Sequence, residues 1–213
     1  MHSKLTSHMP SREEIKVIDV FMCMPFSEMS ISEIMKKSGK KSKTWVFKVL
    51  GSLEKEGALK MNRKGNVNLY RANLDSPAII GKFLLIENLK LAGSGQQDII
   101  SRIVSSIPVK NYCLIIFGSY AEGKQKPGSD IDICFLSDSG EMEKKIRPYM
   151  NEIKLKSNAR IDEHYITHQE FMEMLRRDEE NLGKQIYKKH ILAFNGAIFY
   201  EAIREAGRNG FQG

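Results

Sequence analysis

The spacing of apolar residues over the first third of the chain predicts three helices. The first, over residues 11–24, opens with a Ser-Arg-Glu-Glu capping-box pattern and is ended by a proline. The second and third are ended by Gly39 and Gly57, because glycine readily adopts left-handed backbone angles. Each has two candidate starting residues: Ser30 or Ser32 for the second helix, and Ser42 or Thr44 for the third. The apolar face expected for the third helix consists of Val46, Phe47, Val49, Leu50 and Leu53.

A β-hairpin is predicted after these helices. Residues 58–61 and 67–70 alternate between apolar and polar side chains, and a basic turn over residues 62–66 separates them. Three helices, two of them joined by a tight glycine turn, and a basic hairpin resemble the winged helix-turn-helix family over residues 11–74. In that family the third helix enters the major groove of DNA, and the hairpin, or wing, contacts the backbone or the minor groove. The resemblance implies nucleic-acid contacts by Lys40, Lys41, Lys43, Thr44 and Lys48 in the helix, and by Arg63 and Lys64 in the wing.

The positive charge of the chain is concentrated in this same region. Residues 1–75 hold 14 Lys and Arg against 8 Asp and Glu, whereas residues 76–213 hold 19 against 18. Residues 36–48 contain six lysines and no acid, and such a field attracts phosphate backbones. Lysines position a protein on phosphates more than they read base edges, so little sequence specificity is expected. A solvated helix face, a protein-docking module and a dimerisation element remain the alternatives for this part of the chain.

Further helices and strands are expected to alternate after Pro77. The helix nearest to it is interpreted as a linker that packs both domains together or forms a dimer contact. The C-terminal helices are expected to flank a sheet. The predicted elements are helices at 78–91 and 96–107, strands at 113–117, 129–135 and 160–167, and helices at 169–177, 182–191 and 197–203.

Two short motifs in this second part carry chemistry. Gly118-Ser119 follows a buried strand and opens a helix-like turn, where glycine admits close approach of a ligand and the amides and hydroxyl favour an anion. Asp130 and Asp132 stand two residues apart on the next strand, so we expect both carboxylates on one face, about 6–7 Å apart. Such a pair favours a hard divalent cation, Mg²⁺ above all. An anion site beside two carboxylates predicts a nucleoside-triphosphate site.

These motifs together resemble the polymerase-β-like nucleotidyltransferase superfamily in its minimal form. Its signature is Gly-Ser, ten residues, then Asp-x-Asp, here with the flanking residues Ala121, Gly123 and Ser129, and the resemblance covers residues 95–175. It implies a third acid on a later strand, for which Asp162 is the match, whereas Glu163 would face the other way. It further implies that Asp130, Asp132 and Asp162 hold two Mg²⁺ ions, that Gly118, Ser119 and Ser129 bind the nucleotide, and that an acceptor hydroxyl displaces pyrophosphate from the α-phosphorus.

The sequence therefore predicts an α+β protein of three parts: a winged helix-turn-helix at 11–75, a linker helix at 76–94, and a nucleotidyltransferase domain with a mixed sheet and C-terminal helices at 95–213. The expected activity is transfer of a nucleoside monophosphate, with AMP favoured, from an NTP to an unidentified hydroxyl. Two alternatives stay open: an antitoxin-like protein that adenylylates a partner toxin, and a transcription regulator with a non-catalytic transferase fold. The partners considered are the NTP, DNA, a protein acceptor or toxin, and a second copy of the chain.

The composition of the chain bears on membrane insertion, secretion and the redox environment of the protein. No apolar run approaches the roughly 18–20 residues that a membrane helix needs. Residues 1–14 contain no hydrophobic segment typical of a secretory signal. The three cysteines, Cys23, Cys113 and Cys134, form no paired framework and stand in apolar surroundings, so a reduced, cytoplasmic setting is expected.

Overall fold

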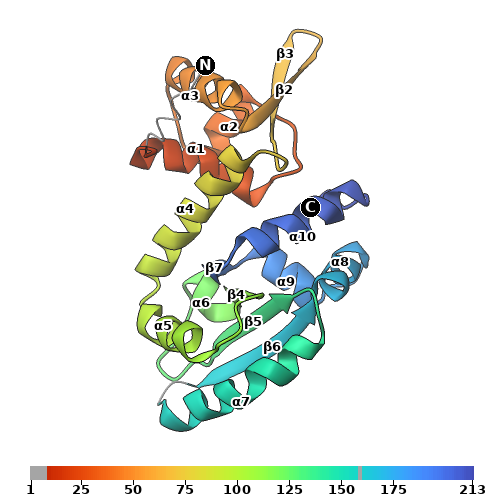
Figure 1. Ribbon diagram of the computed structural model, residues 1–213. Helices are drawn as coiled ribbons and strands as arrows, with labels where there is room; N and C mark the ends of the chain where they lie inside the picture. Colours follow the sequence, from red (N-terminus) through yellow and green to blue (C-terminus); the bar gives the residue numbers. More distant parts are fainter. Residues whose placement is uncertain (1–8, 158–159) are drawn as a thin grey trace, which may run out of the picture. The chain divides into compact units, whose positions relative to one another are not determined.

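The chain forms two compact units, each with its own sheet. The computed structural model describes residues 9–157 and 160–213. The prediction that residues 1–14 contain no secretory signal therefore lies largely outside the described residues. The boundary between the units falls between Phe83 and Leu84, within helix α4 (Pro77–Gly93) (Figure 1).

The N-terminal unit is a winged helix-turn-helix, as predicted. Ser11 and Ser30 each close a capping box with a glutamate three residues later, and Ser42 caps the third helix, which settles the open starting residues. Gly39 ends the second helix with a φ of 70°. The elements in chain order are α1 (Arg12–Cys23), β1 (Met29–Ser30), α2 (Ile31–Ser38), α3 (Lys43–Lys55), β2 (Leu59–Lys64) and β3 (Val67–Ala72).

Three details of this unit differ from the sequence-based predictions. The wing strands extend to Lys64 and from Val67, which pair directly, so the turn is the two residues Gly65 and Asn66 and not a five-residue loop. The short strand β1 was not predicted, and it adds a third antiparallel strand in the order β1-β3-β2. Phe47, expected on the buried face of α3, is 54% exposed, because Val46, Val49, Leu50 and Leu53 already fill that face.

The C-terminal unit is built on a four-stranded mixed sheet in the order β6-β5-β4-β7. Strands β5 and β6 run parallel, whereas β4 pairs antiparallel with both β5 and β7. The prediction of a mixed sheet flanked by helices is confirmed. The elements after α4 are α5 (Gln97–Ser106), β4 (Cys113–Ile116), α6 (Gly118–Glu122), β5 (Ile131–Ser137), α7 (Glu141–Lys156), β6 (Ile161–Thr167), α8 (His168–Arg176), α9 (Leu182–Lys188), β7 (Ile191–Phe194) and α10 (Ala197–Arg208).

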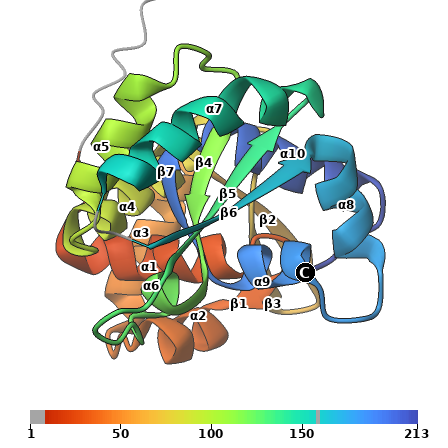
Figure 2. The same ribbon diagram turned by 90° about the horizontal axis from the view of Figure 1, so that it is seen from below.

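Alternation along β5 assigns its side chains to two chemically different faces. Ile131, Ile133 and Phe135 pack into the core with residues of α5 and α7, and Figure 2 shows those two helices over one face of the sheet. Asp132 and Cys134 point to the opposite face, and the helices α8 and α10 both contact β5. Asp162, near the start of β6, has a side chain that is 61% exposed.

Two elements of the C-terminal unit were not predicted, α7 and the edge strand β7. Helix α9 ends at Lys188, and the apolar run that begins at Ile191 pairs with β4 as a strand. The exposed side of β7 is covered from α4 by Glu87, which is 1% exposed and accepts a hydrogen bond of 2.8 Å from the Leu192 N–H. Lys90 of the same helix reaches the other oxygen of Glu87 at 3.1 Å. A sheet edge is thus closed by a side chain.

The helices and the cysteines of the described residues bear on the membrane and disulfide predictions. Within residues 9–157 and 160–213, no helix combines the length and the apolar character that crossing a membrane requires. Cys113 and Cys134 are buried, and no disulfide bond is formed in this part of the chain. The expectation of apolar surroundings is wrong for Cys23, which is exposed at the end of α1.

Candidate active site

The Gly-Ser corner and Asp132 are in direct contact. The chain leaves β4 and turns at Gly118, whose φ is 62°. A Cβ atom at this position would lie 2.0 Å from Oδ2 of Asp132, so only glycine fits there. The backbone N–H of Ser119 donates a hydrogen bond to the Asp132 carboxylate, and the Phe117 N–H donates to the Asp132 carbonyl at 3.0 Å. The two motifs, predicted from separate segments, therefore converge.

The three acids come from two parallel strands and the residue before one of them. Asp132 lies on β5, and its register partner on β6 is Asp162, so the two carboxylates are neighbours across the ladder. Asp130 precedes the first residue of β5, Ile131, and is exposed. The prediction that Asp130 and Asp132 occupy one strand is therefore wrong in detail, because pairing with β6 begins only at Ile131.

Like charges surround Asp132. The pKa of Asp132 is raised, chiefly by burial and then by the negative charges of Asp162 and Asp130. His164 and the Ser119 N–H act in the opposite direction. Carboxylate oxygens are donors that suit Mg²⁺. Across residues 9–157 and 160–213, however, no three His, Cys, Asp or Glu side chains are gathered closely enough to hold a metal ion. The carboxylate oxygens are of the type that Mg²⁺ prefers, although the acids are not gathered into a complete set of ligands.

Strand β6 presents one face to the site and the other to helix α7. Nε2 of His164 lies 3.3 Å from Oδ2 of Asp162, and the His164 ring packs edge-on against Phe117 with centroids 5.4 Å apart. Glu163 points the other way and forms an ion pair with Lys154 of α7. The predicted alternation is confirmed. His164 is a neighbour of the site that the motif does not include, and the period of two along the strand was the signal for it.

Ser129, expected to bind nucleotide, is built into the loop before β5. Its hydroxyl accepts a hydrogen bond of 2.9 Å from the Lys126 N–H, and its own N–H donates to the Lys126 carbonyl at 2.9 Å. The hydroxyl of Tyr120 donates to the Ser129 carbonyl at 3.4 Å. Lys124, on the same loop, pairs with Glu122 at 2.8 Å. Ser129 therefore shapes the loop that connects the Gly-Ser corner to the acids.

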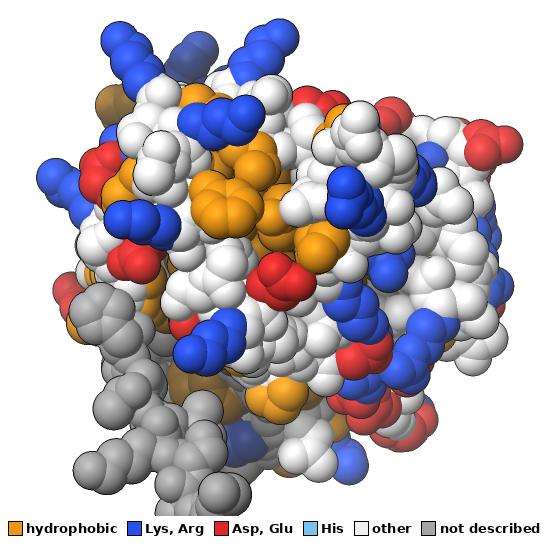
Figure 3. Space-filling view, turned by 90° about the horizontal axis from the view of Figure 1, so that it is seen from above, with side chains coloured by type: hydrophobic (Ala, Val, Ile, Leu, Met, Phe, Trp, Pro, Cys, Tyr) orange, Lys and Arg blue, Asp and Glu red, His pale blue; other side chains and the backbone are white. Residues whose placement is uncertain are grey.

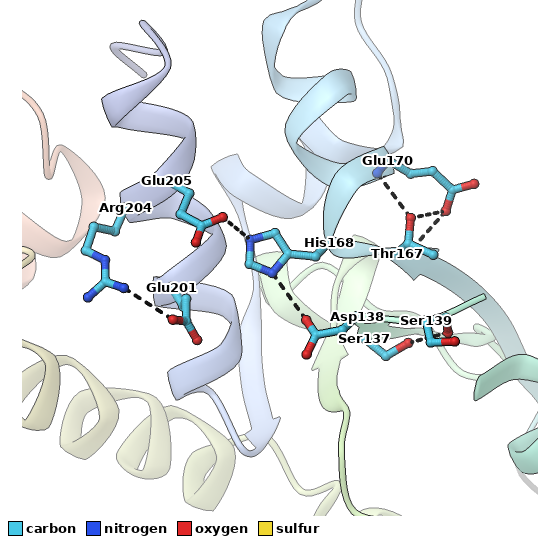
Figure 4. A network of polar contacts seen from close by, with 9 residues as sticks. All are labelled: Ser137, Asp138, Ser139, Thr167, His168, Glu170, Glu201, Arg204 and Glu205. Carbon is cyan, nitrogen blue, oxygen red and sulfur yellow. Dashed lines mark hydrogen bonds and ion pairs between the residues drawn. The ribbon is translucent and has the colours of Figure 1, made fainter. Parts of the chain in front are cut away.

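A second polar cluster lies at the opposite ends of β5 and β6. His168, the first residue of α8, stands between Asp138, 3.5 Å away after β5, and Glu205 of α10, 3.2 Å away (Figure 4). Thr167 caps α8 and closes a capping box with Glu170. These contacts hold α8, α10 and the end of β5 together. They lie at the other end of the strands from Asp132 and Asp162, so we assign them to the scaffold.

Some of the residues predicted to bind nucleic acid are exposed, and others form contacts within the N-terminal unit. Lys40 is engaged, because its side chain is 12% exposed, pairs with Glu13 of α1 and lies over the ring of Trp45. This position corrects the expectation that Lys40 faces a groove. In the wing, Lys64 pairs with Glu28 at 2.8 Å and remains 65% exposed. The residues of this prediction that are exposed on α3 or just before it are Lys41, Lys43, Thr44 and Lys48.

A cleft lies between α2, α3 and the wing. Its volume is about 460 Å³. Lys43 and Arg63 contribute positive charge to it, and the wing turn contributes an amide side chain through Asn66. The residues lining the cleft are Ser30, Ile31, Ser32, Lys43, Arg63, Asn66, Val67 and Asn68. The predicted basic helix and basic wing therefore meet at one concave surface.

Comparison with known proteins finds one family model that matches part of the C-terminal unit. The family model for the nucleotidyltransferase domain matches residues 98–192. Among solved structures, the chain is similar to TrmBL2, described as an archaeal chromatin protein with a novel mode of DNA binding, at 17% sequence identity and a TM-score of 0.28. That match covers 73% of this chain and 65% of TrmBL2, which is less than two thirds of its length. A search of curated proteins gave no match. The nucleotidyltransferase domain model thus matches residues 98–192, which in this chain follow a winged helix-turn-helix.

Proposed function

We propose that the C-terminal unit transfers a nucleoside monophosphate, with AMP as the expected group, from an NTP to a hydroxyl acceptor and releases pyrophosphate. The observation that carries this proposal is the convergence of Gly118 and Ser119 on Asp132, with Asp162 as its neighbour on β6. These are the residue types that nucleotidyl transfer requires, and they stand in a domain of the matching family.

Each site residue has a definite part in this proposal. Gly118 makes room for the Asp132 carboxylate directly beside the backbone, and the Ser119 hydroxyl would donate a hydrogen bond to a phosphate oxygen. Asp130, Asp132 and Asp162 would hold Mg²⁺, which supplies Lewis-acid stabilisation of the phosphate oxygens when it is bound. Asp162, 61% exposed, stands at the solvent side, where an acceptor hydroxyl can reach it. The chain contributes positioning and electrostatic stabilisation.

The test is pyrophosphate release with Mg²⁺ and each NTP in turn, in an extract that supplies the acceptor. Asp132→Asn and Asp162→Asn are expected to lower the rate at least about 100-fold, since each removes a charge where transition-state charge must be balanced. Asp138→Asn is the matched control, because it makes the same chemical change at the other end of β5, where the side chain is 86% exposed. Equal release by wild type and Asp132→Asn would remove the enzymatic proposal.

One observation favours a second candidate, a regulator that binds an NTP without transferring it. Within the described ranges the acids do not gather into a group of three, and Asp162 is largely exposed. The two candidates separate in the same experiment. A regulator binds the NTP in an equilibrium assay and releases no pyrophosphate, whereas a transferase does both. An antitoxin-like role is a special case of transfer, in which the acceptor hydroxyl belongs to a tyrosine of a partner toxin.

The N-terminal unit, in this proposal, holds nucleic acid through its phosphates. Support comes from the exposed lysines before and along α3 and from the cleft that Lys43 and Arg63 line. Phosphate contacts release counterions, so log K should fall linearly with log salt, by about 0.7–0.9 per contact. Lys41→Glu with Lys43→Glu should flatten this slope and weaken binding. Lys55→Glu, at the far end of α3, is the control. A binding constant that does not respond to salt would remove this part of the proposal.

A further inference from the structure

The outward face of α3 carries an aromatic ring among lysines. Lys43, Phe47 and Gly51 stand four residues apart and therefore follow one stripe of the helix, with Thr44 and Lys48 beside it. All five residues are exposed, and Phe47 is the large hydrophobic residue among them, at 54% exposure. No Arg, Asn, Gln or acidic residue lies on this stripe. The centre of the expected recognition surface is therefore apolar and its margin is cationic.

Burial in the core does not account for Phe47. The opposite side of α3 is completed by Val46, Val49, Leu50 and Leu53, all at most 7% exposed. Figure 3 shows hydrophobic side chains gathered in one area, with several Lys and Arg side chains around it and an Asp or Glu side chain at its edge. Gly51, one turn after Phe47, has no atom of the described residues within 4 Å of its Cβ position, apart from its chain neighbours and its own helix backbone.

The cleft beside α3 continues this mixture of apolar and cationic groups. Lys43 belongs to both surfaces, since it lines the cleft and lies one turn before Phe47. The cleft adds the apolar side chain of Val67, which is 47% exposed, and the guanidinium of Arg63. Asn66 and Asn68 add amides that can both donate and accept hydrogen bonds, and among the described residues that line the cleft there is no carboxylate.

The geometry points to single-stranded nucleic acid as the ligand of this surface. An unpaired base of the strand stacks on Phe47, and the phosphates of the strand lie at Lys43, Lys48 and Arg63. The inference rests on the proposed nucleic-acid contact and specifies its substrate class. Base stacking on an aromatic ring, in a positively charged groove, is how proteins hold single strands without reading their sequence. The stripe on α3 has no Arg, Asn or Gln, so two of the residue types that read adenine and one of those that read guanine in a duplex are missing from it. In a duplex, moreover, the faces of the bases are already stacked on one another.

The test compares labelled single strands of DNA and RNA with a duplex of the same sequence, by fluorescence anisotropy on the full chain. Phe47→Ala should weaken single-strand binding about 5- to 150-fold, which corresponds to about 1–3 kcal/mol for one stacked base, and change duplex binding less than about twofold. The variant should fold, because the position is exposed and alanine favours helix. Phe47→Tyr keeps a ring and should bind as wild type does. Leu89→Ala is the control, since Leu89 is similarly exposed, at 46%, on another helix.

Lys43→Gln separates this inference from the broader proposal of nucleic-acid contact. It should weaken binding of single strands and duplex alike and lower the salt slope of both. A different outcome is that Lys43→Gln weakens binding while Phe47→Ala changes the binding of single strands and of duplex equally, or changes neither. That result, or a preference of the wild type for the duplex, would refute stacking of a single strand and leave nucleic-acid contact standing. Absence of binding to every probe at low salt refutes both. A loss of self-association in Phe47→Ala, with single-strand binding unchanged, would make the ring a protein interface and overturn the inference.

Discussion

Replacing Gly118 by alanine tests the contact between the Gly-Ser corner and Asp132. The added Cβ would lie 2.0 Å from Oδ2 and 2.9 Å from Cγ of Asp132, so the carboxylate must move and lose its hydrogen bond from the Ser119 N–H. The backbone angle adds strain, because φ is 62° at this position. Gly123, at the other end of α6, has a φ of 67° with nothing within 4 Å of its Cβ, and it is therefore a control for the angle alone.

The expected costs can be separated by their origin. Left-handed angles cost an alanine about 1–2 kcal/mol, which is the whole effect expected for Gly123→Ala. Gly118→Ala adds overpacking of about 1–3 kcal/mol, so it should destabilise the C-terminal unit by about 2–5 kcal/mol. In an Asp132→Ala background the obstructing Oδ2 and Cγ are absent and only Cβ, 3.3 Å away, remains. The excess cost of Gly118→Ala should then fall to about 0.5 kcal/mol or less, the level of independent sites.

Urea unfolding followed by far-UV circular dichroism measures these costs. The single tryptophan, Trp45, belongs to the N-terminal unit, so its fluorescence reports unfolding of that unit separately. Transfer activity should be lost in Gly118→Ala and largely retained in Gly123→Ala. Equal destabilisation by the two substitutions, or an excess cost that Asp132→Ala leaves unchanged, would show that the corner and the acid are not in contact and would refute the reasoning.

Three further predictions concern charges within the C-terminal unit. Asp132→Asn should raise the midpoint of thermal unfolding at pH 7 while abolishing transfer, because burial and Asp162 disfavour the charged form and raise the pKa of Asp132; a lower midpoint would contradict this. Burial lowers the pKa of His190, with Glu87 acting in the opposite direction, so the unfolded chain binds more protons below about pH 6.5. Stability should then fall as the pH drops below that value, by up to about 1.4 kcal/mol per pH unit, and urea midpoints of His190→Gln should show a flatter profile. Glu87→Ala leaves the Leu192 N–H buried without its acceptor and should cost about 1–3 kcal/mol by urea unfolding, whereas Glu87→Gln keeps an acceptor and should cost less.

The parts of the site that are close in sequence could be predicted. Gly118-Ser119 and Asp132 are joined by one turn and one loop, so an apolar strand, a glycine corner and a second strand were enough to bring them together. The opposite orientations of Asp162 and Glu163 followed from the period of two along a strand. The pairing of Asp162 with Asp132, however, depends on the parallel register of β5 and β6, which no local pattern specifies.

The features that were missed depend on partners distant in sequence. The apolar run from Ile191 follows a helix directly, and only pairing with β4, far earlier in the chain, makes it a strand. Lys40 belongs to a run of lysines, and the sequence alone does not show that the turn at Gly39 directs it toward Glu13. Phe47 counted as one more apolar residue on α3, although the helix had enough others to fill its buried face.

The most direct measurement of the central claim follows two labels of the same nucleotide. ATP labelled at the α-phosphorus and ATP labelled at the γ-phosphorus are incubated separately with the protein, Mg²⁺ and an extract that supplies the acceptor. Nucleotidyl transfer predicts that the α label appears on the acceptor and the γ label in pyrophosphate, and that neither occurs with Asp132→Asn. Transfer of the γ label, or α label on the acceptor with Asp132→Asn as with wild type, would contradict the account.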